Sequence, residues 1–403
     1  MKIRSITCFT PLGEFDQRLN NLADFSQQAK QRFEQAGIEV QTTRLATSSF
    51  TEYAPSEPAN AAAWAAGLEK RAKERGFAYL SLGPASMDHP GSFDLIPTLL
   101  AGTRNVFFTG VMADAARGVD LDAVNACARV IHAAAPLEAG GFANLRFSAI
   151  ANVPPYVPFL PSAYAGERGG AFSLAIESAD AAVEAFEAAG TLREARAGLL
   201  ARLESAAAVM TRAAEELSRD SGLEFKGLDI SLAPFPEQRC SLGGALERLG
   251  LGSLGLHGSL AAAAFVADTL DRGNWKHVGF NGLMLPVLED AVLAERAAQG
   301  TLIVKDLLTY SAVCGTGLDT VPLPGDTSAE ALAALLLDVA ALALRLNKPL
   351  TARLMPVPGK RAGDATNFDF AFFANSRVMA LDAQPLRGLL TGSEKMDIKP
   401  RWN

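Results

Sequence analysis

Short runs with strand-like alternation are separated by longer stretches of helical periodicity. Ile3–Thr10 alternates apolar and polar residues as a half-buried strand does, and Phe15–Ala36 follows with apolar residues three or four positions apart. Gly37 ends this second pattern, where a left-handed glycine commonly closes a helix. Further strands are expected at Ile38–Leu45, Tyr79–Leu82, Asn105–Thr109 and Arg146–Ile150, and further helices at Ala59–Arg75, Phe93–Leu100 and Leu121–Ala135. This rhythm predicts an α/β fold with helices outside a parallel or mixed sheet.

Helical patterns predominate beyond residue 170. Leu192–Leu217 is the clearest, with its apolar residues on one face, and Leu228–Leu232 returns as a strand. The remaining helices are expected at Leu242–Leu249, Ser259–Leu270, Asp290–Ala298 and Ser328–Asn347. The chain thus divides into two halves, 1–150 and 171–383, with a C-terminal tail at 384–403.

A proline-rich segment, 151–170, joins the two halves. Its four prolines between positions 154 and 161 exclude a helix and a central strand. One interpretation is a linker. The other is a packed loop that lines a site, because Tyr156, Phe159 and Tyr164 are more aromatic residues than a solvated linker needs.

Composition removes several classes of function. With 49% hydrophobic and 20% charged residues the chain is not intrinsically disordered, and its net charge of −7 argues against a nucleic-acid partner. The N-terminus lacks a signal-peptide pattern, and the apolar windows at 259–270 and 332–346 are too short to span a membrane. Four dispersed cysteines fit a reducing compartment. We therefore expect a cytoplasmic protein that binds neither membranes nor nucleic acid.

Adjacent carboxylates are the first candidate chemistry. Glu289 and Asp290 follow an apolar strand-like run and precede a helix, so they either stabilise the helix start or act as cation ligands or a general base. Asp319 and Asp326 flank a Pro-x-Pro-Gly turn further along. Carboxylate ligands would favour Mg²⁺, Ca²⁺ or Mn²⁺. A phosphate loop and a G-x-G-x-x-G after a strand are both absent from the sequence, so no nucleotide cofactor is indicated.

Glycines frame two further candidates. Cys314 precedes Gly315 and Gly317, which favours a tight loop over a core strand, and the run from Tyr310 to Asp326 is the densest functional-looking segment. His257 lies between glycines, where it is either a surface turn residue or close to a ligand.

A basic segment near the C-terminus is the candidate anion site. Arg353, Lys360 and Asp364 lie along a segment stiffened by prolines, and Arg and Lys pair with carboxylate or phosphate. The alternative is an exposed basic loop.

Together these segments resemble the DUF711 or UPF0210 family over nearly the whole length. The resemblance is carried by Ile3–Thr7, Asn152–Pro154, Asp229–Pro236, Gly255–Ser259, Pro286–Asp290, Cys314–Thr327 and Pro356–Asp364. It implies a fold similar to pyruvate formate-lyase: one α/β barrel domain over 1–383, with roughly ten strands, outer helices and an inner loop around Cys314. Glycyl-radical chemistry is not expected, because Arg377-Val378-Met379-Ala380 has alanine where that motif has glycine.

The leading hypothesis is a non-radical enzyme acting on a small anionic metabolite, amino-acid-like or another carboxylate. Its expected catalytic residues are Cys314, His257, Glu289 and Asp319; its substrate-binding residues are Asn152, Arg353, Lys360 and Asp364; its possible cation ligands are Glu289, Asp290, Asp319 and Asp326. The alternative is a regulator that senses an amino-acid-like metabolite without turnover. The resemblance also suggests a small ACT-type protein as partner, and base rates favour a homodimer.

Overall fold

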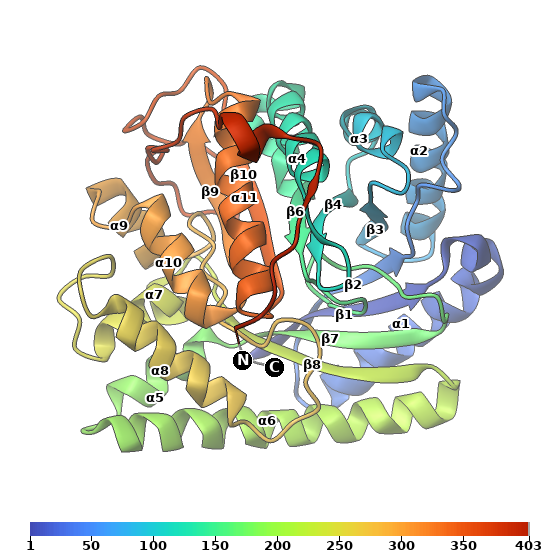
Figure 1. The fold of residues 1–403 in the computed structure, drawn as a ribbon. Helices are drawn as coiled ribbons and strands as arrows, with labels where there is room; N and C mark the ends of the chain where they lie inside the picture. The colour runs from blue at the N-terminus through green and yellow to red at the C-terminus, as the bar shows by residue number, and fades with distance from the viewer. Residues whose placement is uncertain (402–403) are drawn as a thin grey trace.

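A large mixed sheet runs through the molecule. A computed structural model describes residues 1–401, and Figure 1 shows its elements. The strands are β1 (Lys2–Thr10), β2 (Val40–Thr47), β3 (Tyr79–Ala85), β4 (Val106–Asp114), β5 (Gly118–Asp120), β6 (Phe147–Ala151), β7 (Ala171–Glu177), β8 (Glu224–Ala233), β9 (Gly317–Pro324), β10 (Leu350–Val357) and β11 (Lys395–Met396). They form an 11-stranded sheet in the order β8-β7-β1-β2-β3-β4-β6-β10-β9, with β5 and β11 paired beside β4.

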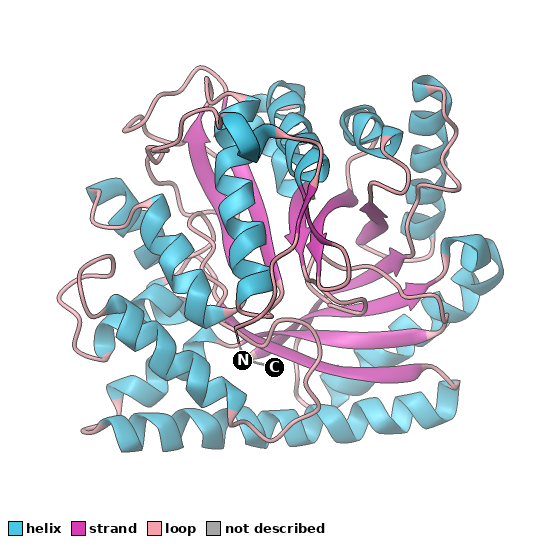
Figure 2. Cartoon of the chain, viewed as in Figure 1, coloured by secondary structure: helices cyan, strands magenta, loops and turns pink. Residues whose placement is uncertain are grey.

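Helices surround the strands, which occupy the middle of the molecule in Figure 2. They are α1 (Phe15–Gln35), α2 (Pro58–Glu74), α3 (Gly91–Gly102), α4 (Leu121–Ala134), α5 (Ala179–Glu187), α6 (Leu192–Ser221), α7 (Leu242–Arg248), α8 (Ser259–Asp271), α9 (Ala291–Gln299), α10 (Val304–Cys314) and α11 (Ala329–Arg345). The long α6 packs against β8, as Figure 1 shows. The α/β prediction is confirmed.

Local sequence explains where the longest helices begin and end. The predicted apolar stripe of α1, including Leu22 and Phe33, is buried. Thr191 caps α6 by accepting a hydrogen bond from the Glu194 N–H, and Gly222 ends it in the left-handed conformation at φ 73°. These helices were predicted from the sequence to within a few residues.

Both halves of the chain contribute to the same sheet. Most neighbouring strands are parallel, but β7 is antiparallel to β1 and β10 is antiparallel to β6. Regular strand pairing leaves the sheet open between β8 and β9. The irregular segment 276–289 hydrogen bonds to both end strands: the Met284 N–H donates to Ser231 O at 2.9 Å, and the Val287 N–H donates to Asp319 O at 3.1 Å.

The proline-rich segment 151–170 is packed against the sheet. Val157 and Phe159 are buried, and the Thr7 hydroxyl on β1 donates to Pro158 O at 2.9 Å. The interpretation as a packed loop is therefore supported over that of a solvated linker.

The tight loop expected at Cys314 and the Pro-x-Pro-Gly turn expected between Asp319 and Asp326 were predicted wrongly. Residues up to Cys314 belong to α10, and Gly317–Pro324 forms the buried strand β9. Pro322 lies inside β9, which is at the end of the sheet, where a missing N–H is tolerated. The strand β7 and the helices α5 and α10 were also missed as elements.

Two glycines beside Cys314 are required by the backbone. Gly315 ends α10 at φ 84°. Gly317 has φ 100°, and a Cβ there would lie 2.1 Å from the Thr351 carbonyl oxygen of β10. Close packing of a helix end and a strand therefore explains the glycine pattern.

Membrane spanning was assessed over residues 1–401. Within that range, the helices lack the combination of length and hydropathy that crossing a bilayer requires.

Candidate functional site

Charged and aromatic side chains from distant parts of the chain line one cavity. Its volume is about 90 Å³. The lining residues are Arg4, Gln41, Thr42, Arg44, Tyr79, Phe107, Leu145, Phe159, Leu160, Met284, Glu289, Asp319, Arg353, Phe370 and Phe372. This volume is several times what a single water needs. The cavity therefore matches a small metabolite.

Four of these side chains form an ion-pair chain that is buried except at Arg4, which is partly buried. Arg353 on β10 donates from Nε to Asp319 Oδ1 at 2.5 Å and from Nη2 to Glu289 Oε1 at 2.6 Å. Arg4 on β1 donates from Nη2 to the other Glu289 oxygen at 2.5 Å. Arg353, Glu289 and Asp319 are each less than 9% exposed. Such pairs hold their geometry because separating them leaves a buried charge uncompensated.

An irregular backbone positions Asp319. The pairing of β9 with β10 shifts register between Ala352 and Leu354, which flank Arg353. Thr320 has φ 41°, an uncommon value for a β-branched residue. Its hydroxyl accepts a hydrogen bond from the Leu288 N–H at 3.3 Å, one residue before Glu289. This strained bulge brings both carboxylates to one guanidinium.

The two carboxylates differ in proton affinity. Burial alone would raise the pKa of Glu289, but Arg353 and Arg4 outweigh it and lower that pKa. Burial raises the pKa of Asp319, and the Glu289 charge adds to the effect although Arg353 opposes it. Asp319 is therefore the easier of the two to protonate, and its Oδ2 accepts no hydrogen bond from any described residue.

Arg44 on β2 differs from the other two arginines. It is only 8% exposed, and no carboxylate among residues 1–401 lies within 4 Å of its guanidinium. Its Nε donates to Thr42 Oγ1 at 3.0 Å, and its guanidinium carbon lies 5.6 Å from the Tyr79 ring centre. Burial, followed by repulsion from Arg4, lowers the pKa of Arg44 to about 9, so the group stays protonated at neutral pH.

Aromatic residues close the remaining walls. Phe159 and Leu160 come from the proline-rich loop, and Phe107 packs edge-on against Tyr79 with ring centres 5.4 Å apart. Phe370 and Phe372 come from a C-terminal segment whose rings also contact each other, at 5.3 Å. Apolar walls strengthen the electrostatic interactions inside the cavity by keeping water out.

The cavity carries an excess of positive charge. Three guanidinium groups, from Arg4, Arg44 and Arg353, face the two carboxylates of Glu289 and Asp319. This count covers the residues that line the cavity. Just outside the lining, Glu177 lies 3.8 Å from Arg4 and 3.3 Å from the Lys2 ammonium, and Lys2 also lies 3.9 Å from Glu39, whose side chain is exposed to solvent screening.

The structure brings together three of the predicted site residues: Arg353, Glu289 and Asp319. Lys360 lies outside the cavity, in the turn after β10, where its carbonyl accepts a hydrogen bond from the Gly325 N–H. Asp364 is exposed and accepts a hydrogen bond from the Arg361 N–H. Asn152 lies elsewhere and contacts Asn347.

The other two predicted cation ligands lie apart from this pair. Asp290 is the N-cap of α9 and also accepts hydrogen bonds from the Ser241 hydroxyl and the Gly243 N–H. Asp326 is exposed. Over residues 1–401, three or more His, Cys, Asp or Glu side chains nowhere gather in an arrangement suited to a metal ion. Cation binding stays a prediction.

Cys314 lies in the hydrophobic core and outside the cavity. It is the last residue of α10 and is 3% exposed, and its sulfur lies 3.9 Å from the Thr316 hydroxyl. The structure thus gives it the position of a packing residue at a helix end, which differs from the inner-loop position expected from the sequence.

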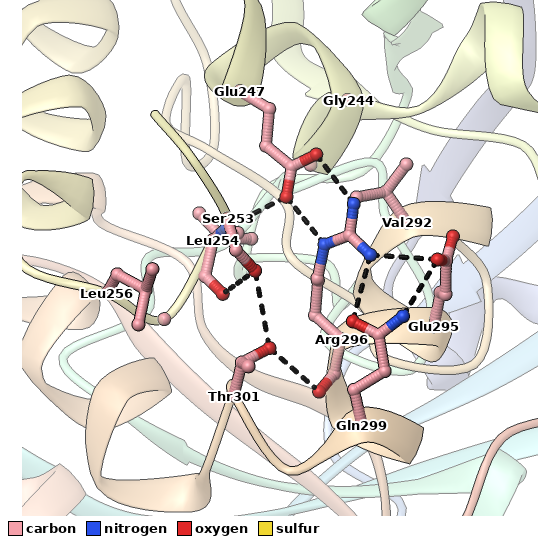
Figure 3. Close-up of polar contacts among 12 residues, drawn as sticks. Gly244, Glu247, Ser253, Leu254, Leu256, Val292, Glu295, Arg296, Gln299 and Thr301 are labelled. Atoms are coloured by element: carbon pink, nitrogen blue, oxygen red, sulfur yellow. Dashed lines mark hydrogen bonds and ion pairs between the residues drawn. The ribbon is translucent and has the colours of Figure 1, made fainter. Parts of the chain in front are cut away.

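His257 is exposed in a loop that an ion pair anchors. Glu247 accepts both Arg296 Nε at 2.7 Å and Arg296 Nη2 at 2.9 Å, and it also accepts the Leu254 N–H (Figure 3). Ser253 and Thr301 add a hydroxyl contact. This arrangement supports the interpretation of His257 as a surface turn residue.

Sequence reasoning missed Arg4, Arg44 and Tyr79. The available signal was a cation inside an otherwise apolar or neutral strand, since buried arginine is rare unless it is paired or functional. Arg4 follows Ile3, and Arg44 precedes Leu45.

These features define an α/β protein whose mixed sheet carries a charged cavity of metabolite size. The chain belongs to the DUF711 family, described as "Uncharacterised ACR", whose model matches residues 1–375. It is 39% identical over 276 residues to a UPF0210 protein of Pyrobaculum aerophilum, an alignment that covers 66% of this chain and 58% of the relative.

Two further UPF0210 proteins match over more of their length. The one from Pyrobaculum arsenaticum is 34% identical over 81% of this chain and 76% of the relative. The one from Pyrobaculum islandicum is 32% identical over 90% of this chain and 83% of the relative.

Proposed function

We propose that the protein is a non-radical enzyme that binds a small anionic metabolite in this cavity and transfers a proton to or from it. One observation carries the proposal: three guanidinium groups, of which those of Arg44 and Arg353 are buried, face only two carboxylates in a space of metabolite size. Burying an uncompensated charge costs several kcal/mol, so a bound anion would stabilise the cavity.

Asp319 is the proton-transferring group in this proposal. Its pKa is raised while that of neighbouring Glu289 is lowered, and such a divergence separates an acid/base group from a permanently charged one. Arg353 orients Asp319 through Oδ1, which leaves Oδ2 for the ligand. Glu289 stays ionised and holds Arg4 and Arg353 in place.

Cys314 and His257 have no role in the proposal, because both lie outside the cavity. The proposal also assigns no cation to Glu289 and Asp319, since both already bind Arg353.

The test is a thermal-shift screen over amino acids, keto acids, hydroxy acids and sugar phosphates, followed by NMR of each hit in D₂O. Proton transfer at carbon appears as loss of a ligand ¹H signal. Asp319→Asn should bind the ligand but slow the exchange by roughly 100-fold or more, while exposed Asp326→Asn serves as the matched control. Binding without exchange or turnover would favour the ligand-sensing regulator instead.

A further inference from the structure

Arg44 is the cavity residue whose presence the fold itself does not explain. Its guanidinium makes one hydrogen bond, from Nε to Thr42 Oγ1. Nη1 and Nη2 donate to no described residue. Burial without a carboxylate is costly for a guanidinium group, and the contact with the Tyr79 ring offsets only part of that cost. An apolar residue on β2 would therefore stabilise the protein more.

The shape of the free group selects a type of partner. The two terminal nitrogens of a guanidinium form a planar fork that matches the two oxygens of a carboxylate. Arg4 and Arg353 cannot offer the same fork. Arg4 donates its terminal nitrogens to Pro234 O and Glu289, and Arg353 donates to Asp319 and Glu289. Arg44 is thus the arginine that remains available to a ligand.

The charge balance of the cavity also restricts the net charge of the ligand. One negative charge neutralises the excess of one positive charge in the cavity. A phosphate monoester carries about −1.5 to −2 at neutral pH, and a dicarboxylate carries two negative charges, so either would leave an uncompensated negative charge beside Glu289.

Resting on the proposed function, we propose that the ligand is a small monocarboxylate whose carboxylate pairs with the Arg44 fork. Arg44 is then the residue that determines specificity. Its position on β2, away from the bulge of β9 and β10, lets one ligand contact Arg44 with its carboxylate and Asp319 with the atom that exchanges a proton.

The experiment is isothermal titration calorimetry of the full-length protein with three matched probes: lactate, tartronate and 2-phospholactate. Tartronate replaces the lactate methyl group with a second carboxylate, and phospholactate adds a phosphate to the same skeleton. Lactate should bind at least tenfold more tightly than either of the other two. Arg44→Gln should weaken lactate binding by roughly 10- to 100-fold, Arg44→Lys should weaken it less, and exposed Arg239→Gln should leave it unchanged.

Thermal unfolding without ligand separates a binding role from a structural one. Arg44→Gln should unfold at the wild-type temperature or above it, because it removes a buried unpaired charge. A structural arginine would instead give a lower unfolding temperature, which would overturn the inference.

The outcomes also separate this inference from the proposed function. Tighter binding of tartronate or phospholactate, or unchanged lactate binding by Arg44→Gln, overturns the monocarboxylate inference and leaves an anion-binding enzyme standing. If none of the three anions binds the wild-type protein, both proposals fail.

Discussion

The cavity and the two glycine-framed residues, Cys314 and His257, were both candidate sites in the sequence, but the structure treats them differently. In the cavity, Arg353, Glu289 and Asp319 converge from separate segments on buried contacts of 2.5 and 2.6 Å. Cys314 and His257 stand among glycines, yet one is buried in the core and the other is exposed. The glycines beside Cys314 and His257 therefore reflect what the backbone requires there. The arginines inside strands, in contrast, mark the cavity.

The largest expected effect comes from breaking the ion-pair chain. Arg353→Met should destabilise the protein by about 3–5 kcal/mol, because Asp319 loses its partner and Glu289 keeps only Arg4. Urea unfolding measures the change, with exposed Arg239→Met as a control expected within about 0.5 kcal/mol of wild type. A loss under about 1 kcal/mol would show that the network is not a buried, coupled unit.

Asp229 is a buried carboxylate with no arginine partner, so it can be compared with Glu289 and Asp319 in the cavity. Asp229 accepts hydrogen bonds from Ser231, Phe280 and Asn281, yet burial raises its pKa to about 6. The folded state therefore holds a proton that the unfolded state releases near its ordinary pKa of 3.8. This contribution to stability is present below about pH 4 and is lost as the pH rises through 6.

The direction of this pH dependence is tested by measuring the free energy of unfolding of wild type and Asp229→Asn at pH 4 and pH 7. The free energy of unfolding of wild type minus that of the variant should fall by about 1–3 kcal/mol from pH 4 to pH 7. A difference that grows with pH would mean that Asp229, like Glu289, is stabilised in its charged form.

Cys314 should behave as a core residue. Cys314→Ala should cost about 1 kcal/mol and leave ligand affinity unchanged. In the folded protein, alkylation should be faster at the partly exposed Cys240 than at Cys314. Mass spectrometry of the labelled peptides decides this, and preferential labelling of Cys314 would restore it as a candidate nucleophile.

The smallest effect is expected at His257. His257→Ala should change the free energy of unfolding by no more than about 0.5 kcal/mol, because the side chain is exposed. Ligand binding should match wild type in the same titration. A loss of affinity would place the 249–258 loop at the site.

Much of the fold could be predicted because local patterns determine it. The apolar stripe of α1 and the caps of α6 were readable without tertiary information. Strand β9 was not, because Pro322 and its flanking glycines resemble a turn unless the strand is known to lie at the end of the sheet.

The site was predictable only in part. Glu289, Asp319 and Arg353 were recognised as charged groups near element ends, but their mutual contacts depend on the register shift between β9 and β10. Lys360 was grouped with Arg353 by proximity in sequence, yet it lies beyond the end of β10. Arg44 was missed because strand pairing, which a single sequence does not specify, brings β2 beside β1 and β3.

The most direct test of the anion site is anomalous X-ray diffraction from crystals soaked in sodium bromide. Bromide is a monoanion that needs no knowledge of the natural ligand. The charge balance predicts a peak inside the cavity in contact with the Arg44 guanidinium, and loss of that peak in Arg44→Gln crystals. Bromide peaks confined to the protein surface, with the cavity empty, would contradict the account.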